Sequence, residues 1–167
     1  MGQLVETVIE DGRWAGLDLD TLAEAAARAA LAGLGLAADG FRIALLACDD
    51  ARIAVLNADF RGKPAPTNVL SWPSEERAAE FVGEEPERPG AGTADEPEDL
   101  GDIAIAWETC AREAAGQGKP MQAHVAHLVV HAVLHLLGYD HVEDEDAVLM
   151  EGHEVRILAS MGLPDPY

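Results

Sequence analysis

Residues 41–73 read FRIALLACDDARIAVLNADFRGKPAPTNVLSWP, and this stretch decides the fold class. The apolar run Phe41–Ala47 predicts a strand. The two aspartates after it can cap a helix, and Ile53 and Leu56 give that helix an apolar face. A glycine and two prolines end the helix, and Asn68–Trp72 predicts another short strand. Strand, helix and strand in succession indicate a layered architecture of helices packed on a sheet.

The flanking segments continue the same alternation. Residues 3–10 predict a strand, and Thr21 to Glu24 has the capping-box form that begins an Ala/Leu-rich helix. Gly101–Trp107 predicts a fourth strand. Helices are expected at about residues 107–116, 120–137 and 144–161.

These elements predict the order βαβαββααα. We therefore expect one α+β domain over residues 1–167, with a four-stranded mixed sheet packed with about five helices. The alternation of strand and helix in the first half favours some parallel pairing.

Residues 74–100 interrupt this pattern. The segment holds ten acidic and two basic residues, with three prolines and three glycines among them. This composition predicts a flexible, solvated acidic loop between two strands, with room for one helical turn near Ala78 to Val82.

Composition excludes several classes of protein. The chain has 167 residues, of which 49% are hydrophobic and 25% are charged, as in an average globular domain. No apolar run is long enough to span a bilayer, and the first residues lack the pattern of a secretory signal. Cys48 and Cys110 lie in apolar segments and predict free buried thiols, so we expect a cytoplasmic protein with no membrane partner.

The net charge bears on the kind of partner. The chain carries 31 acidic and 11 basic side chains, a formal net charge of -20. A polyanion such as RNA is repelled on average by such a protein, which argues against non-specific nucleic-acid binding but not against a local site.

Histidines gather on one predicted helix. His124, His127, His131 and His135 project within a sector of about 80° at 100° per residue. His131 and His135 are four residues apart, Gly138 can then break the helix, and His141 follows three residues later. Three neutral imidazoles with an open fourth position are typical of a catalytic zinc site, which predicts one Zn²⁺ per chain. We expect His124 and His127 not to ligate the ion, and His153 to lie at the surface or behind the site.

The spacing H-x3-H-x5-H equals that of the extended zincin motif, with one difference. The position after the first histidine is Ala132, where those proteases need a glutamate as general base. Peptide hydrolysis by the zincin route is therefore disfavoured. A metal at this place can still polarise a phosphoryl oxygen or activate water.

Several blocks of the chain resemble one known family. The stretch AHLVVHAVLHLLGYDH (126–141) is similar to the signature of the YbeY rRNA maturation factors, which are bacterial metal-dependent endoribonucleases. LNADFRGK (56–63), TNVLSWP (67–73) and LGDI (100–103) resemble further blocks of that family, as does MGLPDPY (161–167). The departures are a tryptophan in place of phenylalanine in the second block and the long acidic loop.

The resemblance implies a single-strand-directed endoribonuclease. Its expected role is rRNA maturation at the 3′ end of small-subunit (16S) rRNA, together with ribosome quality control, and its partners are rRNA, the ribosome and ribosome-associated proteins. It implies a zinc-type site on His131, His135 and His141. It also implies that Arg61 corresponds to an arginine that is important in the family. We therefore expect Arg61 and His131 to be the catalytic residues.

Residue chemistry alone leaves alternatives around this site. Arg61 ends a helix in a basic patch and either binds a phosphodiester through two hydrogen bonds or binds a carbonyl at the helix end. Trp72 and Trp107 either stack on unpaired bases or pack in the core. Asp102 and Asp140 either orient imidazoles or cap local turns. No general base is evident.

Two other functions are consistent with the residues. One is a non-catalytic ribosome-assembly factor whose metal site is structural or binds RNA ends, which the acidic charge favours. The other is a small-substrate metallohydrolase, which Ala132 disfavours when the substrate is a peptide.

Overall fold

The computed structural model of the protein describes residues 3–167 and confirms the α+β class and the predicted order of elements. Two short 3-10 helices, Gly12–Leu17 and Ala38–Gly40, add to that order. The strands and α-helices are β1 (Val5–Ile9), α1 (Leu19–Gly33), β2 (Phe41–Cys48), α2 (Asp50–Arg61), β3 (Val69–Pro73), β4 (Glu98–Ala106), α3 (Trp107–Gly116), α4 (Met121–Leu136) and α5 (Asp144–Ser160).

The four strands form one mixed sheet, as predicted, in the order β1-β2-β4-β3. β1 and β2 are parallel, and so are β2 and β4, whereas β3 runs antiparallel to β4. Ile103 at the centre of β4 pairs with Leu45 on one side and Ser71 on the other. β3 is thus an edge strand, and the segment between α2 and β3 lies at the rim of the sheet.

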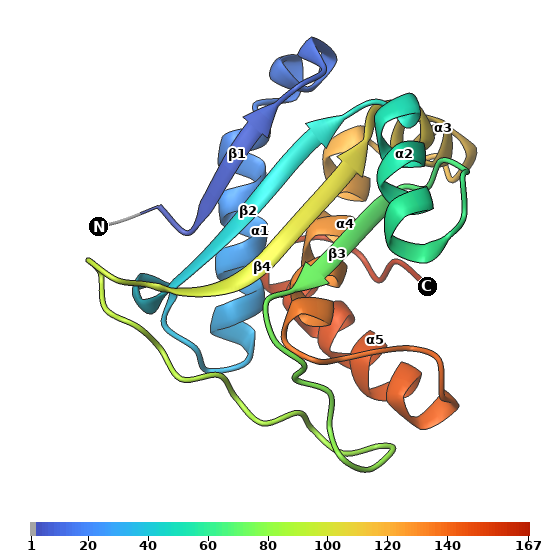
Figure 1. Cartoon of the computed structure of the whole chain (residues 1–167). Coiled ribbons are helices and arrows are strands. Elements are labelled where there is room, and N and C mark those ends of the chain that lie inside the picture. Colours follow the sequence, from blue (N-terminus) through green and yellow to red (C-terminus); the bar gives the residue numbers. More distant parts are fainter. Residues whose placement is uncertain (1–2) are drawn as a thin grey trace.

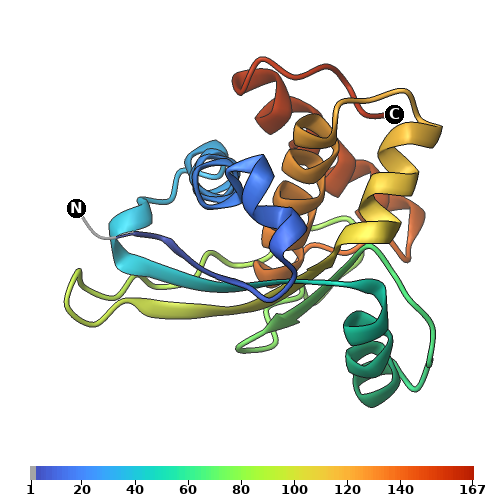
Figure 2. The ribbon, with the colours of Figure 1, turned by 90° about the horizontal axis from the view of Figure 1, so that it is seen from above.

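The helices are distributed unequally between the two faces of the sheet. α1, α3, α4 and α5 lie on one side of it, and α2 alone lies on the other (Figures 1 and 2). α4 contacts α1, α3 and α5 as well as the strands, so it is the central helix of this layer.

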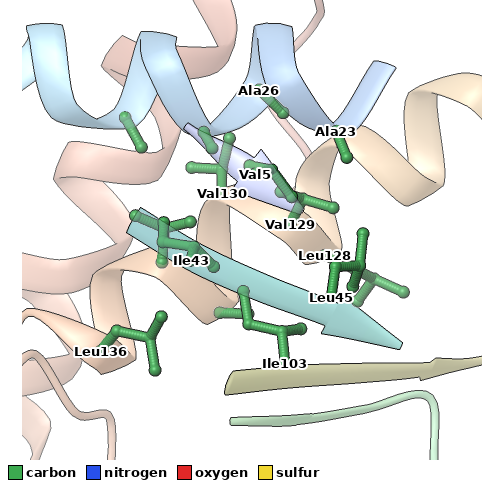
Figure 3. Packing of buried hydrophobic residues seen from close by; sticks show 14 of the residues in the cluster. Val5, Ala23, Ala26, Ile43, Leu45, Ile103, Leu128, Val129, Val130 and Leu136 are labelled. Carbon is green, nitrogen blue, oxygen red and sulfur yellow. The ribbon is translucent and has the colours of Figure 1, made fainter. Parts of the chain in front are cut away.

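The main core lies between the sheet and this helix layer (Figure 3). Ala23 and Ala26 are fully buried on α1, where small side chains allow close approach to the sheet. Val129 of α4 packs in the same cluster with Ile43 and Leu45 of β2. Burying each large aliphatic side chain contributes about 1.5–3 kcal/mol, so the position of α4 is strongly fixed.

One predicted helix start is wrong. The first α-helix begins at Leu19 with Asp18 at the N-cap, not at Thr21, which lies inside the first turn. Glu24 does not complete a capping box, because its carboxylate accepts the backbone N–H groups of Leu4 and Val5 at 3.0 and 2.8 Å. A contact with β1 therefore replaces the local bond that the sequence pattern indicated.

The acidic loop ends three residues earlier than predicted, because residues 98–100 belong to β4. Residues 74–97 contain no helix or strand, and the helical turn expected near Ala78 to Val82 is absent. The segment is nevertheless tied to the helix layer. Arg77 Nη1 donates to the carbonyl of Leu136 at 3.0 Å, and the Gly83 N–H donates to the Asp146 carboxylate at 2.8 Å. These bonds hold the acidic loop across the end of α4 (Figure 1).

Two smaller expectations can also be compared with the structure. Cys48 and Cys110 are free and buried, as predicted. Over residues 3–167, no helix is long and apolar enough to cross a membrane.

Candidate metal centre

The two predicted metal-ligating histidines of α4 lie near its C-terminal end. The helix buries Val125, Val129 and Val133 in the core, which turns the side of the helix that carries His131 and His135 toward a partly open surface. Both imidazoles are half-buried and lie one helical turn apart, with ring centroids 4.6 Å from each other. The spacing of four residues therefore brings them together without any tertiary contact.

The turn after α4 brings in the third histidine. Gly138 has a φ of +103°, and the following Tyr139 N–H bonds back to the carbonyl of Leu134 at 3.0 Å. The chain reverses there, and the His141 ring lies 5.2 Å from each of the other two rings, centroid to centroid. The expected grouping of His131, His135 and His141 is thus present in the folded chain.

The hydrogen-bond partners fix which ring nitrogens face the shared point. His135 Nδ1 donates to the carbonyl oxygen of Tyr139 at 2.9 Å, and His131 Nδ1 donates to the carboxylate of Glu154. Both partners only accept, so each Nδ1 carries the proton and each Nε2 presents a lone pair. The two Nε2 atoms lie 3.1 Å apart. Two lone pairs this close repel each other unless a metal ion or a shared proton lies between them.

This geometry fits a zinc ion. Zn–N bonds of about 2.0–2.1 Å in a tetrahedral site place two nitrogens about 3.3 Å apart, close to the Nε2–Nε2 distance of 3.1 Å. Burial, together with the neighbouring His131 and His141, lowers the pKa of His135 to about 4. A neutral imidazole is the form that binds a metal, so His135 is ready to ligate at neutral pH.

A carboxylate that the sequence analysis did not single out lies behind the site. Glu154 of α5 has no exposed surface and accepts hydrogen bonds from His131 Nδ1 and from His127 Nε2, the latter at 3.2 Å. Burial raises the pKa of this carboxyl group, but the bonds from the two imidazoles, together with the charge of His131 and the Tyr167 hydroxyl, outweigh that effect and lower the pKa to about 2. The sequence does contain one indication of this residue: Glu154 has the helical spacing of Met150, Ile157 and Leu158, so a charged side chain lies on the apolar face of the last helix.

The remaining histidines lie outside the group of three. His124 is buried and pairs with Glu113 at 2.9 Å, and His127 bonds to Glu154. His127, His131 and Glu154 lie close enough to form a second group that could hold a metal ion, and the expectation that His124 and His127 do not ligate the ion stays a prediction. The His153 side chain is largely covered, with Glu85 of the acidic loop at 2.8 Å and the centroid of the Tyr139 ring 5.0 Å from its own.

Arg61 and His135 line the same cleft. The cleft has a volume of about 550 Å³, and its walls come from the end of α2, from β3 with the start of the acidic loop, and from the end of α4. Arg61 is exposed, with its guanidinium 5.9 Å from the centroid of the Phe60 ring. Over residues 3–167 it forms neither a salt bridge nor a hydrogen bond to a carbonyl at the end of α2. The tertiary structure thus places Arg61 and His135, which are 74 positions apart in the chain, in the same cleft.

The two aspartates and two tryptophans with alternative predicted roles lie in different surroundings. Asp140 accepts the backbone N–H of His141 at 2.7 Å, so it caps the local turn. Asp102 is exposed on the opposite face of the sheet, in a groove beside Trp72, so of its two alternatives the orientation of an imidazole does not apply. Trp72 packs on Phe60 and Trp107 on Trp14, and both are half-buried at the edges of apolar clusters.

The fold and this site define a class: small α+β proteins with three clustered histidines that could hold a metal ion, beside a cleft containing an arginine. Comparison with known sequences specifies the family. The family model of endoribonuclease YbeY matches residues 10–162. The chain therefore belongs to the endoribonuclease YbeY family.

Similar proteins agree with this assignment. The chain is 64% identical to endoribonuclease YbeY of Cereibacter sphaeroides over 167 residues, covering the whole of both proteins. It is 56% identical to endoribonuclease YbeY of Paracoccus denitrificans, covering 99% of this chain and 90% of that one. A protein of Thermotoga maritima, whose structure was determined in solution, has the same fold with a TM-score of 0.55 at 18% identity, over 95% of this chain and 92% of that one.

Proposed function

We propose that the chain is a zinc-dependent, single-strand-specific endoribonuclease whose ion is held by His131, His135 and His141. Membership of the family gives the chain an endoribonuclease role in rRNA processing. The observation that carries the finer proposal is the pair of Nε2 lone pairs that face each other at 3.1 Å. A divalent cation relieves their repulsion, and nitrogen ligands suit zinc.

The chemistry expected of the ion is electrostatic. When bound, zinc acts as a Lewis acid that polarises the scissile phosphate and stabilises the charge that develops on its oxygens. The histidines fix the position of that charge, because two of the three rings are held by hydrogen bonds on their far side.

Arg61 supplies a second positive charge to the cleft. A guanidinium binds two oxygens of one phosphodiester through parallel hydrogen bonds. Arg61 is exposed and lines the cleft together with His135, so its guanidinium is available to a phosphate held there. We assign it the role of neutralising the phosphate in the transition state.

The substrate is expected to be ribosomal RNA at the 3′ end of the small-subunit (16S) molecule, with a role in ribosome quality control. The net charge of -20 repels free RNA, and Glu75 and Glu76 of the acidic loop line the same cleft. The ribosome or a ribosome-associated protein is therefore the expected means of bringing the strand to Arg61. A cytoplasmic location follows from this substrate.

Metal content and RNA cleavage, measured on the same preparation, test the proposal. Wild-type protein should bind one zinc per chain and cut single-stranded rRNA fragments but not duplex ones, and His135→Ala should lose both the zinc and the cleavage. Equal zinc content in the two proteins would reject the ligand set. Zinc binding without cleavage in wild type would favour the alternative of a non-catalytic assembly factor.

A further inference from the structure

Glu154 is the only fully buried carboxylate among residues 3–167, and three donors surround it. His131 Nδ1 donates to one oxygen, and His127 Nε2 and the Tyr167 hydroxyl donate to the other. A buried charge costs several kcal/mol unless hydrogen bonds compensate for it. The three donors provide that compensation, so the carboxylate stays ionised beside His131.

This contact acts on His131 in two ways. A carboxylate only accepts, so it holds the proton on Nδ1 and directs the Nε2 lone pair toward His135 and His141. It also makes the imidazole a more basic ligand. His135 has only a neutral carbonyl at the equivalent position, so the two ligands of α4 are not supported equally.

The segment after α5 completes the arrangement. Tyr167 lies across His127, with the ring centroids 5.6 Å apart and the rings nearly perpendicular. Its backbone N–H bonds to Asp165 at 2.9 Å, which turns the segment back toward α4. Tyr167 as a whole residue is 62% exposed, yet its hydroxyl reaches the buried carboxylate. Tyr167 therefore closes the outer side of the contact without belonging to the core.

Two other roles for Glu154 do not fit the geometry. It cannot serve as the general base, because it has no exposed surface and lies on the side of His131 that faces away from the group of three. A second cation between His127, His131 and Glu154 is also disfavoured, because hydrogen bonds already join these groups and the Tyr167 hydroxyl occupies the same carboxylate oxygen as His127.

We propose that Glu154 is a positioning residue for the metal ligand His131, and that Tyr167 holds Glu154 in place from the outside. The inference rests on the proposed zinc site. Removal of either side chain should weaken zinc binding without removing a ligand.

The test measures affinity for Zn²⁺ alone, by competition with a chromophoric chelator, and the visible absorption of Co²⁺ in the same site. The variants are Glu154→Gln, which keeps size but removes the charge, and Tyr167→Phe, which removes only the hydroxyl. Glu151→Gln is the matched control, because it removes one negative charge from the same helix near Tyr167 without touching His131. Thermal unfolding of the metal-free proteins checks that each variant folds.

Glu154→Gln should weaken Zn²⁺ binding ten- to a hundred-fold, the usual effect of losing a partner that orients a metal ligand, and should change the Co²⁺ spectrum. Tyr167→Phe should weaken it by a smaller factor, and Glu151→Gln should leave both readouts unchanged. If Glu154→Gln does not fold, Tyr167→Phe decides the question, since Tyr167 lies at the surface.

Unchanged Zn²⁺ affinity in Glu154→Gln and Tyr167→Phe would overturn the inference, and so would equal losses in all three variants. A lower melting temperature with unchanged affinity would assign both residues a purely structural role, which also overturns it. Failure of wild-type protein to bind zinc would instead reject the proposed function, so the two failures are distinguishable.

Discussion

Replacing Gly138 by alanine should damage both the stability of the protein and its metal site. The residue has a φ of +103°, a conformation that costs a non-glycine residue about 1–3 kcal/mol. A Cβ atom there would also lie 2.3 Å from the carbonyl oxygen of Arg77, whereas ordinary contacts begin at 3.4 Å. The turn or the acidic loop must therefore move by about 1 Å, and overpacking of this kind costs about 1–3 kcal/mol more.

Together these terms predict a loss of about 2–6 kcal/mol in the free energy of unfolding. For a chain of this length, each kcal/mol corresponds to about 2–4 °C, so the melting temperature should fall by roughly 4–24 °C. The same displacement moves His141, which follows three residues later, away from His131 and His135. We therefore expect weaker zinc binding in the fraction that remains folded.

Urea unfolding of the metal-free protein, followed by zinc titration at a temperature where the variant is folded, measures both effects. Gly152→Ala is the control, because Gly152 lies inside α5 with no atom within 4 Å of an added Cβ. That change should stabilise the protein by about 0.5–1 kcal/mol. The reasoning is refuted if Gly138→Ala unfolds at the same urea concentration as wild type and binds zinc with the same affinity.

Three further changes test other parts of the structure. Arg61→Ala should keep the fold and the zinc but slow single-turnover RNA cleavage about 30- to 1000-fold, and Arg61→Lys should restore the rate only in part; equal rates in all three proteins would remove Arg61 from the chemistry. In the metal-free protein, the free energy of unfolding should fall as the pH drops from 6.5 to about 4, because burial lowers the pKa of His135 to about 4 and only the unfolded chain then binds the proton. Urea unfolding at several pH values measures this effect, and His135 should change the free energy of unfolding by at most about 1.4 kcal/mol per pH unit. A free energy of unfolding that does not change between pH 6.5 and 4 would contradict the prediction. Arg77→Ala should destabilise the protein by about 1–3 kcal/mol in the same assay, because it leaves the carbonyls of Leu136 and Leu100 without this donor; full stability would show that water replaces the guanidinium.

Local spacing accounts for the parts of this protein that the sequence predicted well. His131 and His135 face the same way because a helix repeats every 3.6 residues, and Gly138 allows the reversal that returns His141. The order of strands and helices was predictable for a similar reason, since apolar periodicity and turn residues act over a few positions.

Contacts between elements that are distant in the chain could not be predicted from local spacing. Thr21 and Glu24 have the pattern of a capping box, but Glu24 bonds to the backbone of β1 because that strand lies beside α1 in the fold. A local preference of about 1 kcal/mol gave way to a tertiary contact with two buried N–H groups.

The metal site shows the same division. The sequence by itself determined the three histidines, since their grouping depends on one helix and one turn. Only the tertiary structure decided what supports and faces them: α5 places Glu154 behind His131, and the packing of α2 and β3 brings Arg61 to the cleft beside His135. The physical reason is that burial and pairing of charges depend on which elements pack together, and packing is determined by the whole core rather than by neighbours in the chain.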